Sequence, residues 1–253
     1  MDFSNEFLIK LESERSRVRQ KYLELAEGFL TRTYKDPQAR EYASDGFSRR
    51  LSTLARCIDN VFEILPPDRI DPPSSDEISD TMINIQASVF NTSGCVDDLA
   101  WIWVKEKAVL KKNGSPLSKF EVGLRKTNVL CSFSTEFQQY LGGLANWFDQ
   151  LDNFRNALAH RIPLYIPPYV VPTSKETKYR ELQDLIIEAE RQKDFVKVKE
   201  LRDKQDALVT FKPIITHSFE ERAVPIFFHP QLLANFLTIE ELGETMLKEL
   251  EHC

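Results

Sequence analysis

The chain has 253 residues, of which 42% are apolar and 28% are charged, and this amount of apolar material excludes a wholly disordered chain. Only 8 residues are glycine, which disfavours large antiparallel sandwiches and phosphate-binding loops, and no uninterrupted apolar run is long enough to span a membrane. Acidic residues outnumber basic residues by 39 to 33, a net charge of −6, which excludes a protein that coats nucleic acid with its whole surface and leaves only a local basic patch for that purpose.

Three helices are predicted in the first half of the chain from apolar residues spaced three and four apart. The first spans residues 5–31. The second ends at the Pro-Pro pair 66–67, because proline removes a backbone donor and biases the preceding residue away from the helix. The third opens at Ser74, which forms a capping box with Glu77, and runs to the turn signal at 111–114.

Residues 105–126 form the one strongly basic stretch of this length, with seven lysines and arginines against two glutamates. Two interpretations stay open: a solvated loop, or a surface that contacts an RNA backbone. On the second interpretation the nucleic-acid-binding residues are Lys111, Lys112, Lys119, Arg125, Lys126 and, further along the chain, Arg161.

A fourth helix is predicted to begin at Ser134 or Thr135 and to end by residues 161–162, just before Pro163. Its apolar stripe consists of Phe137, Leu141, Leu144, Phe148, Leu151 and Leu158, with Arg155 in the same register.

A proline-bounded extension follows, over residues 163–237. Its segment 175–208 carries dense, balanced charge and predicts a helical hairpin that turns at Lys193-Asp194. The hairpin resembles the UVR-type interaction hairpin, which implies contact with a protein partner; a simple structural arm is the alternative. Two β-branched and aromatic segments after it predict short strands or extended lids.

A capping box at Thr238 and Glu241 predicts a last helix from residue 239 to about 249. The chain therefore reads as mainly all-α and as a single domain, 1–253. Its parts are a helical-bundle core (1–162), the extension with its hairpin and extended segments (163–237) and a C-terminal helix (238–253).

The four cysteines are scattered, with no pair close enough for a metal-binding knuckle. They predict buried thiols in a reducing cytosol, and the first residues lack the basic and apolar segments of a secretory signal, so we expect a cytoplasmic protein. No group of residues indicates a metal site or a cofactor. The lone histidines His217 and His229 are expected to be structural.

The most informative string lies at the end of the fourth helix, Asp-Asn-Phe-Arg-Asn-Ala-Leu-Ala-His-Arg at 152–161. Arg155 falls on the apolar stripe, where a charge is costly unless it is paired or reaches water. A second, polar stripe contains Asp149, Asn153, Asn156 and His160, and Asp149 and Asn153 are expected to line a cleft.

These residue types suit RNA cleavage without a metal. Imidazole gains and loses a proton near neutral pH, so His160 is a candidate general acid or base. A guanidinium holds a phosphate by two parallel hydrogen bonds, so Arg155 is a candidate to stabilise the phosphorane formed when a 2′-hydroxyl attacks. The reaction needs two proton-transfer groups, and a two-fold homodimer would supply a second His160.

The string resembles the motif of the HEPN superfamily: an Arg followed by a polar residue, then a few residues and a His, at the end of a helix in an all-α bundle. The resemblance implies a HEPN-like fold and a metal-independent endoribonuclease, usually dimeric, often in toxin–antitoxin, antiphage defence or RNA-processing settings. It implies that Arg155 and His160 are the catalytic pair and that Asn156 shapes the site. It does not account for residues 163–253.

Two other interpretations stay open. In one, the protein is a non-catalytic HEPN-like dimer that binds through the motif and contacts a partner through the hairpin. In the other, the motif is structural, with His160 capping the helix end and Arg155 paired to Asp152 or Asp149.

Overall fold

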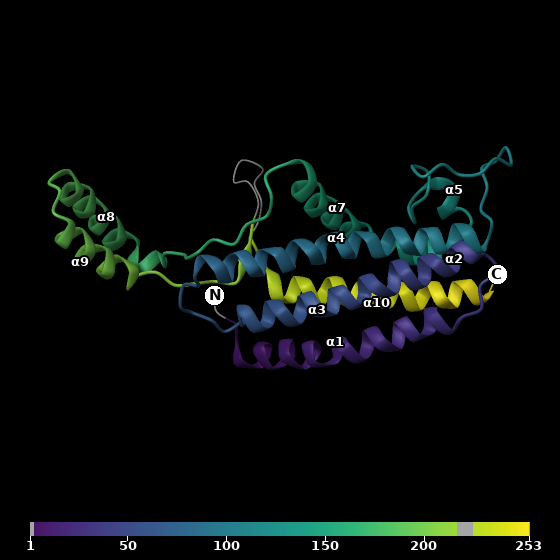
Figure 1. The fold of residues 1–253 in the computed structure, drawn as a ribbon, viewed down its shortest axis with the longest axis horizontal. Coiled ribbons are helices and arrows are strands. Elements are labelled where there is room, and N and C mark those ends of the chain that lie inside the picture. The colour runs from purple at the N-terminus through teal and green to yellow at the C-terminus, as the bar shows by residue number, and fades with distance from the viewer. Residues whose placement is uncertain (1–2, 217–224, 253) are drawn as a thin grey trace.

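The computed structural model describes residues 3–216 and 225–252, and it is a helical bundle with one protruding hairpin (Figure 1). This confirms the predicted mainly all-α architecture with a charged helical hairpin and a short β segment near the C-terminus. Four long helices make the bundle: α1 (Asn5–Thr31), α3 (Arg49–Ile64), α4 (Ser75–Glu106) and α10 (Phe228–His252).

Shorter helices join or flank these four. Between α1 and α3 lie α2 (Pro37–Glu41) and a π-helix, η1 (Tyr42–Ser48). After α4 come α5 (Thr127–Leu130), α6 (Thr135–Gly143) and α7 (Ala145–His160). A 3-10 turn, η2 (Thr173–Lys175), leads into the hairpin helices α8 (Glu176–Arg191) and α9 (Phe195–Asp206).

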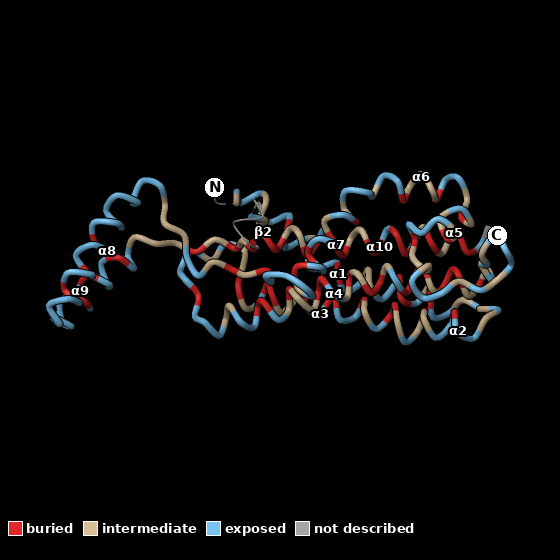
Figure 2. The backbone as a smooth tube through the Cα atoms, turned by 90° about the horizontal axis from the view of Figure 1, so that it is seen from above, coloured by how far each residue is buried: buried red, intermediate tan, exposed pale blue. Residues whose placement is uncertain are grey.

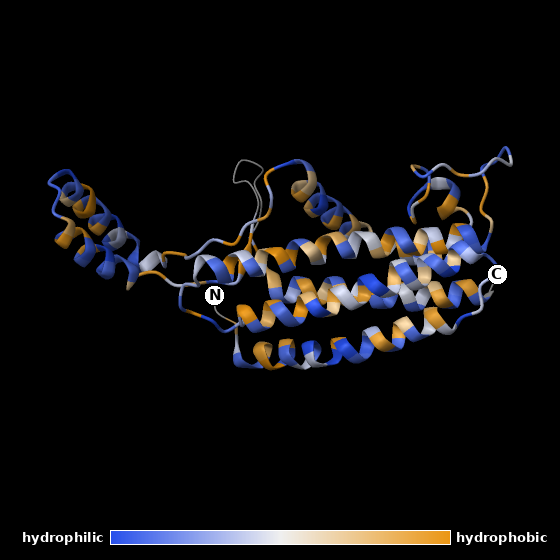
Figure 3. Cartoon of the chain, in the orientation of Figure 1, coloured by the Kyte–Doolittle hydropathy of each residue, from blue (hydrophilic) through white to orange (hydrophobic). Residues whose placement is uncertain are grey.

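One continuous apolar core runs the length of the bundle, from Leu11 in α1 to Leu250 in α10. Polar and apolar residues alternate along each long helix (Figure 3), and buried residues alternate with exposed ones along the same helices (Figure 2). Among residues 3–216 and 225–252, no helix combines the length and the apolarity that a membrane crossing requires.

Local signals at two helix starts are confirmed. The first helix has the predicted bounds, 5–31. At α4 the Ser74 hydroxyl accepts from the Glu77 amide and the Glu77 carboxylate accepts from the Ser74 amide, which is the predicted capping box. The helix ends at Glu106, before the predicted turn, because Ala108 adopts a left-handed backbone with φ 49° and reverses the chain.

The predicted last helix begins eleven residues too late. α10 starts at Phe228, and Thr238 lies inside it, where its hydroxyl donates to the carbonyl of Ala234 at 2.8 Å. Pro230 does not stop the helix because it occupies the first turn, where the backbone N–H has no helical partner. α10 therefore belongs to the bundle core together with residues 1–162 and contributes its buried residues Phe228, Leu232, Leu233 and Phe236.

The predicted continuous helix over 135–161 is two helices, α6 and α7, separated at Leu144. Gly142 and Gly143 have low helix propensity, and the Leu144 amide donates to the carbonyl of Leu141 in a tighter turn. Beyond Leu151, the buried stripe of α7 also differs from the predicted one. The buried stripe is Phe148, Leu151, Phe154 and Ala157, so the predicted place of Arg155 on the apolar stripe was wrong.

The charged hairpin is confirmed, with a turn at Lys193 (φ 58°) and an N-cap at Asp194. Its apolar residues form a small cluster separate from the bundle core: Leu182, Ile186, Ala189, Val198 and Leu201. At its root, β1 (Ile214–Ile215) pairs antiparallel with β2 (Ile226–Phe227), as the β-branched segments predicted. His217 lies outside the described residues.

Because the two cores are separate, we expect Ile186→Ala to destabilise only the hairpin. Removing this buried side chain should cost about 2–4 kcal/mol of hairpin stability. Hydrogen exchange should then speed up in α8 and α9 and stay unchanged in α1, α3, α4 and α10, with the exposed Glu181→Ala as control. Faster exchange in the bundle helices would contradict two separate cores.

Candidate functional site

The three motif residues lie on the solvent side of α7. The side chains of Arg155, Asn156 and His160 are exposed. Within the described part of the chain, none of the three makes a hydrogen bond or an ion pair. The motif is therefore available to a ligand or to a second protein chain.

Arg155 lines a cleft of about 590 Å³ between α4, α7 and the loop that follows residue 121. The floor is apolar and includes Phe148 and Leu151 of α7. The remaining residues of the cleft are Ser93, Val96 and Asp97 of α4, Val122, Gly123, Leu124, Arg125 and Lys126 of the loop, and Asp152 of α7. The α4 wall of the cleft was not predicted from the sequence, although Ser93 and Asp97 are one helical turn apart and thus share a face.

Arg125 forms ion pairs with two carboxylates of α7. Its two terminal nitrogens donate to Asp149 and to Asp152, each at 2.8 Å, and its guanidinium lies 4.8 Å from the ring centre of Phe148. Asp152 stands three residues before Arg155 on α7 and would otherwise be its natural helical partner. The predicted structural pairing of Arg155 with Asp152 or Asp149 is thus wrong, because Arg125 holds both carboxylates.

One acidic group interacts electrostatically with Arg155 across the cleft. Partial burial raises the pKa of Asp97, and the positive charges of Arg155 and then Arg50 oppose that rise. Asp152 raises the pKa of Asp97 further. An anion that binds at Arg155 therefore has to compete with the Asp97 carboxylate.

His160 is the last residue of α7 and is not among the residues that line the Arg155 cleft. Side chains five positions apart point about 140° away from each other around a helix. A single chain therefore presents Arg155 in the cleft, and His160 is not part of its lining. The helix end is closed by the backbone of Arg161, whose amide donates to the carbonyl of Ala157 at 3.1 Å, and not by the imidazole.

The other predicted cleft residues make contacts within the chain. Asn153 accepts from the Arg161 guanidinium through its backbone carbonyl at 3.0 Å and through its side chain. Asp149 accepts from Arg125, as described above, and neither Asp149 nor Asn153 lines the cleft.

Part of the basic stretch is neutralised by its own neighbours. Lys111 pairs with Glu121 at 2.7 Å, and hydrogen bonds from Lys111 and then Ser118 lower the pKa of Glu121 to about 2. Lys119 lies 5.1 Å from the ring centre of Phe120. Lys112 and Lys126 are exposed and have no acidic partner among the described residues, so both remain available to an anionic ligand.

The thiols differ from the prediction in one case. Cys57 and Cys95 are buried, whereas Cys131 is exposed on the chain between α5 and α6. Cys253 lies outside the described residues. In those residues, no cluster of three or more His, Cys, Asp or Glu side chains is placed to hold a metal ion.

A search of protein-family models, of curated proteins and of solved structures finds no match to this chain.

Proposed function

We propose that this chain is a metal-independent endoribonuclease of the HEPN type that acts as a two-fold dimer. The 2′-oxygen of one nucleotide attacks the adjacent phosphorus, and the bond from phosphorus to the 5′-oxygen of the next nucleotide breaks. The products are a 2′,3′-cyclic phosphate and a 5′-hydroxyl. A toxin or an antiphage defence system is a setting in which such a nuclease would act.

One observation carries the proposal: Arg155 faces a cleft with its guanidinium unpaired, because Arg125 binds the neighbouring carboxylates. A free guanidinium on an open cleft is suited to a phosphate, which it binds by two parallel charge-assisted hydrogen bonds. The same group stabilises the extra negative charge of the phosphorane.

His160 supplies the proton transfers. One imidazole removes the proton of the 2′-hydroxyl, and a second, protonated imidazole gives a proton to the leaving 5′-oxygen. A single chain has one exposed histidine at the motif, so the second comes from the two-fold partner. The dimer also brings a His160 to an Arg155 cleft that lacks one within the chain.

The proposal predicts cleavage of single-stranded RNA in the presence of excess chelator. Because the nucleophile is the substrate's own hydroxyl, the products should carry 2′,3′-cyclic phosphate ends, which mass spectrometry identifies. A matched RNA with a single 2′-deoxy nucleotide at the cleavage position should stay intact at that bond. Cleavage of the deoxy bond, or no cleavage of any RNA by the dimeric protein, would contradict the proposal.

Arg125→Ala is expected to weaken substrate binding. Without Arg125, the Asp152 carboxylate is free to pair with Arg155. It then competes with the substrate phosphate for this guanidinium. Because an exposed ion pair is weak, KM should rise only about two- to fivefold, with little change in kcat. The double variant Arg125→Ala/Asp152→Asn should recover the wild-type KM, since the competing charge is gone. A KM in the double variant equal to that of Arg125→Ala would show that Arg125 acts on the substrate directly.

A second candidate function is a non-catalytic dimeric interaction protein. The protruding hairpin favours it, because the tip of α9 carries Phe195 and Val196, which are 71% and 73% exposed. Large apolar side chains at a protruding tip suit contact with a protein partner. This function predicts no RNA turnover and a loss of partner binding when Phe195 is replaced by Ser.

A further inference from the structure

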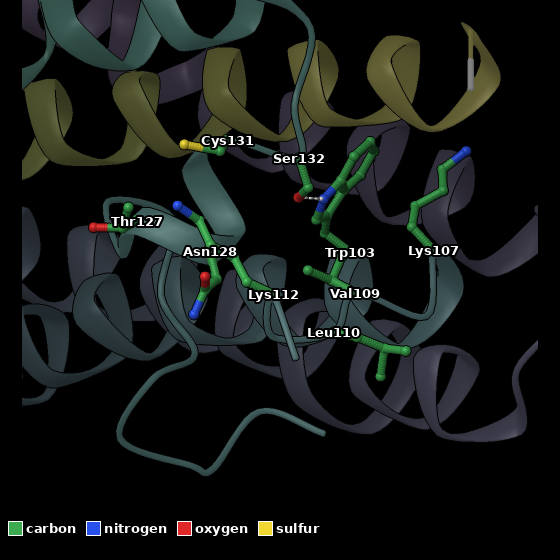
Figure 4. A pocket seen from close by; sticks show the side chains of 9 residues that line it. All are labelled: Trp103, Lys107, Val109, Leu110, Lys112, Thr127, Asn128, Cys131 and Ser132. Atoms are coloured by element: carbon green, nitrogen blue, oxygen red, sulfur yellow. Dashed lines mark hydrogen bonds between the residues drawn. The ribbon is translucent and has the colours of Figure 1, made fainter. Parts of the chain in front are cut away.

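A second cavity lies at the end of α4, and Arg155 is not among the residues that line it (Figure 4). Its volume is about 430 Å³, within the usual range for small-molecule sites. Trp103, Val109 and Leu110 form its apolar side. The other lining residues are Lys107, Lys112, Thr127, Asn128, Cys131 and Ser132.

Hydrogen bonds between segments of the chain hold the walls of this cavity in place before a ligand binds. The indole N–H of Trp103 donates to the Ser132 hydroxyl at 2.8 Å, which connects α4 to the chain after α5. The reversal at Ala108 brings the Val109 amide to the carbonyl of Val104 at 3.0 Å and places Val109 and Leu110 beside Trp103. A ligand would meet walls that are already in place, which reduces the cost of binding.

The cavity is positively charged, since two lysines and no acidic residue line it. Lys107 is already engaged: its ammonium donates to the carbonyl of Leu250 at 3.1 Å and lies 5.4 Å from the ring centre of Trp103. Lys112 has no partner within the described ranges, and in Figure 4 it extends from its loop toward the α5 side of the cavity. The ammonium group of Lys112 is therefore available to bind an anionic group of a ligand.

The cavity adjoins the Arg155 cleft. Lys126 lines the cleft, and the next residue, Thr127, lines the cavity. Consecutive Cα atoms are about 3.8 Å apart, so one short stretch of chain contributes to both sites. Exposed cations belong to each of them: Arg155 and Lys126 line the cleft, and Lys112 lines the cavity.

We propose that this cavity is a nucleotide subsite for single-stranded RNA, one that receives a nucleotide adjacent to the one at Arg155. Lys112 would bind the phosphate, Val109 and Leu110 would contact the face of the base, and Thr127 and Asn128 would offer hydrogen bonds to its edge. Single-stranded RNA is required because a base must leave its stack to enter. The inference rests on the proposed function for the placement of the strand.

The exposed thiol of Cys131 provides the test, because it lines the cavity. The full chain is treated with N-ethylmaleimide, and modification of the Cys131 peptide is followed by mass spectrometry. The probe is a short 2′-O-methyl oligoribonucleotide, which binds but has no free 2′-hydroxyl with which to react. Inorganic phosphate at the same phosphate concentration is the control for simple charge effects.

We expect the oligonucleotide to slow Cys131 labelling, and phosphate to leave it unchanged. Lys112→Glu should weaken oligonucleotide binding by about tenfold in fluorescence anisotropy, the value of one charge-assisted contact. The matched variant Lys178→Glu, on the distant hairpin, makes the same change of charge and should bind as wild type.

The outcomes separate this inference from the proposed function. Unchanged labelling with RNA bound, or equal losses in Lys112→Glu and Lys178→Glu, would overturn the subsite even if the protein cleaves RNA. Protection of Cys131 with a specific loss in Lys112→Glu supports the subsite even if cleavage is absent.

Discussion

Replacing His160 or Arg155 by alanine is expected to abolish RNA cleavage without unfolding the protein. Loss of a general acid or base typically lowers kcat by about 10²–10⁴-fold, and loss of a group that stabilises transition-state charge costs about 10²–10³-fold. Both side chains are exposed and unpartnered in the described part of the chain, so their removal breaks no native contact. The unfolding temperature should therefore match that of the wild type.

Arg56→Ala is the matched control, since Arg56 is an exposed arginine on α3 outside the cleft. It should retain full cleavage in the same assay, which compares product formation in chelator at equal concentrations of dimer. Full activity in both His160→Ala and Arg155→Ala would reject the nuclease proposal. Loss of the dimer in Arg155→Ala, measured by solution mass, would instead support the interaction protein.

Helix positions were predictable where the signal is local. The start of α4 depends on two side chains three residues apart, Ser74 and Glu77, and the hairpin turn depends on Lys193 and Asp194. Such signals act within one turn of chain and do not depend on the rest of the fold. The start of α10 was missed because it depends on burial of Phe228 and Phe236 in a core built from distant helices.

A partly buried ion pair was also not predicted. Arg50 of α3 donates to the Asp98 carboxylate of α4 at 2.9 Å, beside the π-helix η1. A Cβ added at Gly46 would lie 2.8 Å from Asp98, and one added at Gly94 would lie 2.4 Å from Arg50, so both glycines make room for the pair. The helices are brought together by tertiary packing, which spacing along the chain does not reveal.

The contacts around Arg155 in the candidate site also depend on residues that are distant in the sequence. The sequence indicated Arg155, Asn156 and His160 as candidates, but it placed Arg155 on the apolar stripe and left open a structural pairing with Asp152 or Asp149. The guanidinium is free because Arg125, thirty residues earlier, reaches α7 and takes Asp149 and Asp152. A contact across that distance depends on where the loop folds. The ion pairs around the motif therefore depend on tertiary structure, whereas the residue types of the motif can be read from the sequence.

The buried His229 should make the stability of the protein depend on pH. It is fully buried between Phe62 and Phe228. Its Nε2–H donates to the carbonyl of Leu65 at 2.7 Å, while Nδ1 has no hydrogen-bond partner among the residues that the structure describes. Burial lowers the pKa of His229 from 6.5 to about 3, although the bond to Leu65 opposes this shift. Between these two pH values the unfolded chain binds a proton at this site and the folded chain does not.

The free energy of unfolding contributed by His229 is therefore present above pH 6.5 and lost as the pH falls toward 3. Asp98 acts in the opposite direction, because burial raises its pKa from 3.8 to about 6. The dependence of the wild-type free energy of unfolding on pH would therefore not reveal the contribution of His229 by itself. His229→Gln keeps an amide donor for Leu65 and does not titrate. Urea unfolding gives the free energy of unfolding of the wild type and of the variant. The wild-type value minus the variant value should fall by about 1.4 kcal/mol for each pH unit between about pH 6 and pH 4. If this difference in free energy of unfolding were constant with pH, His229 would bind its proton equally well in the folded and the unfolded chain.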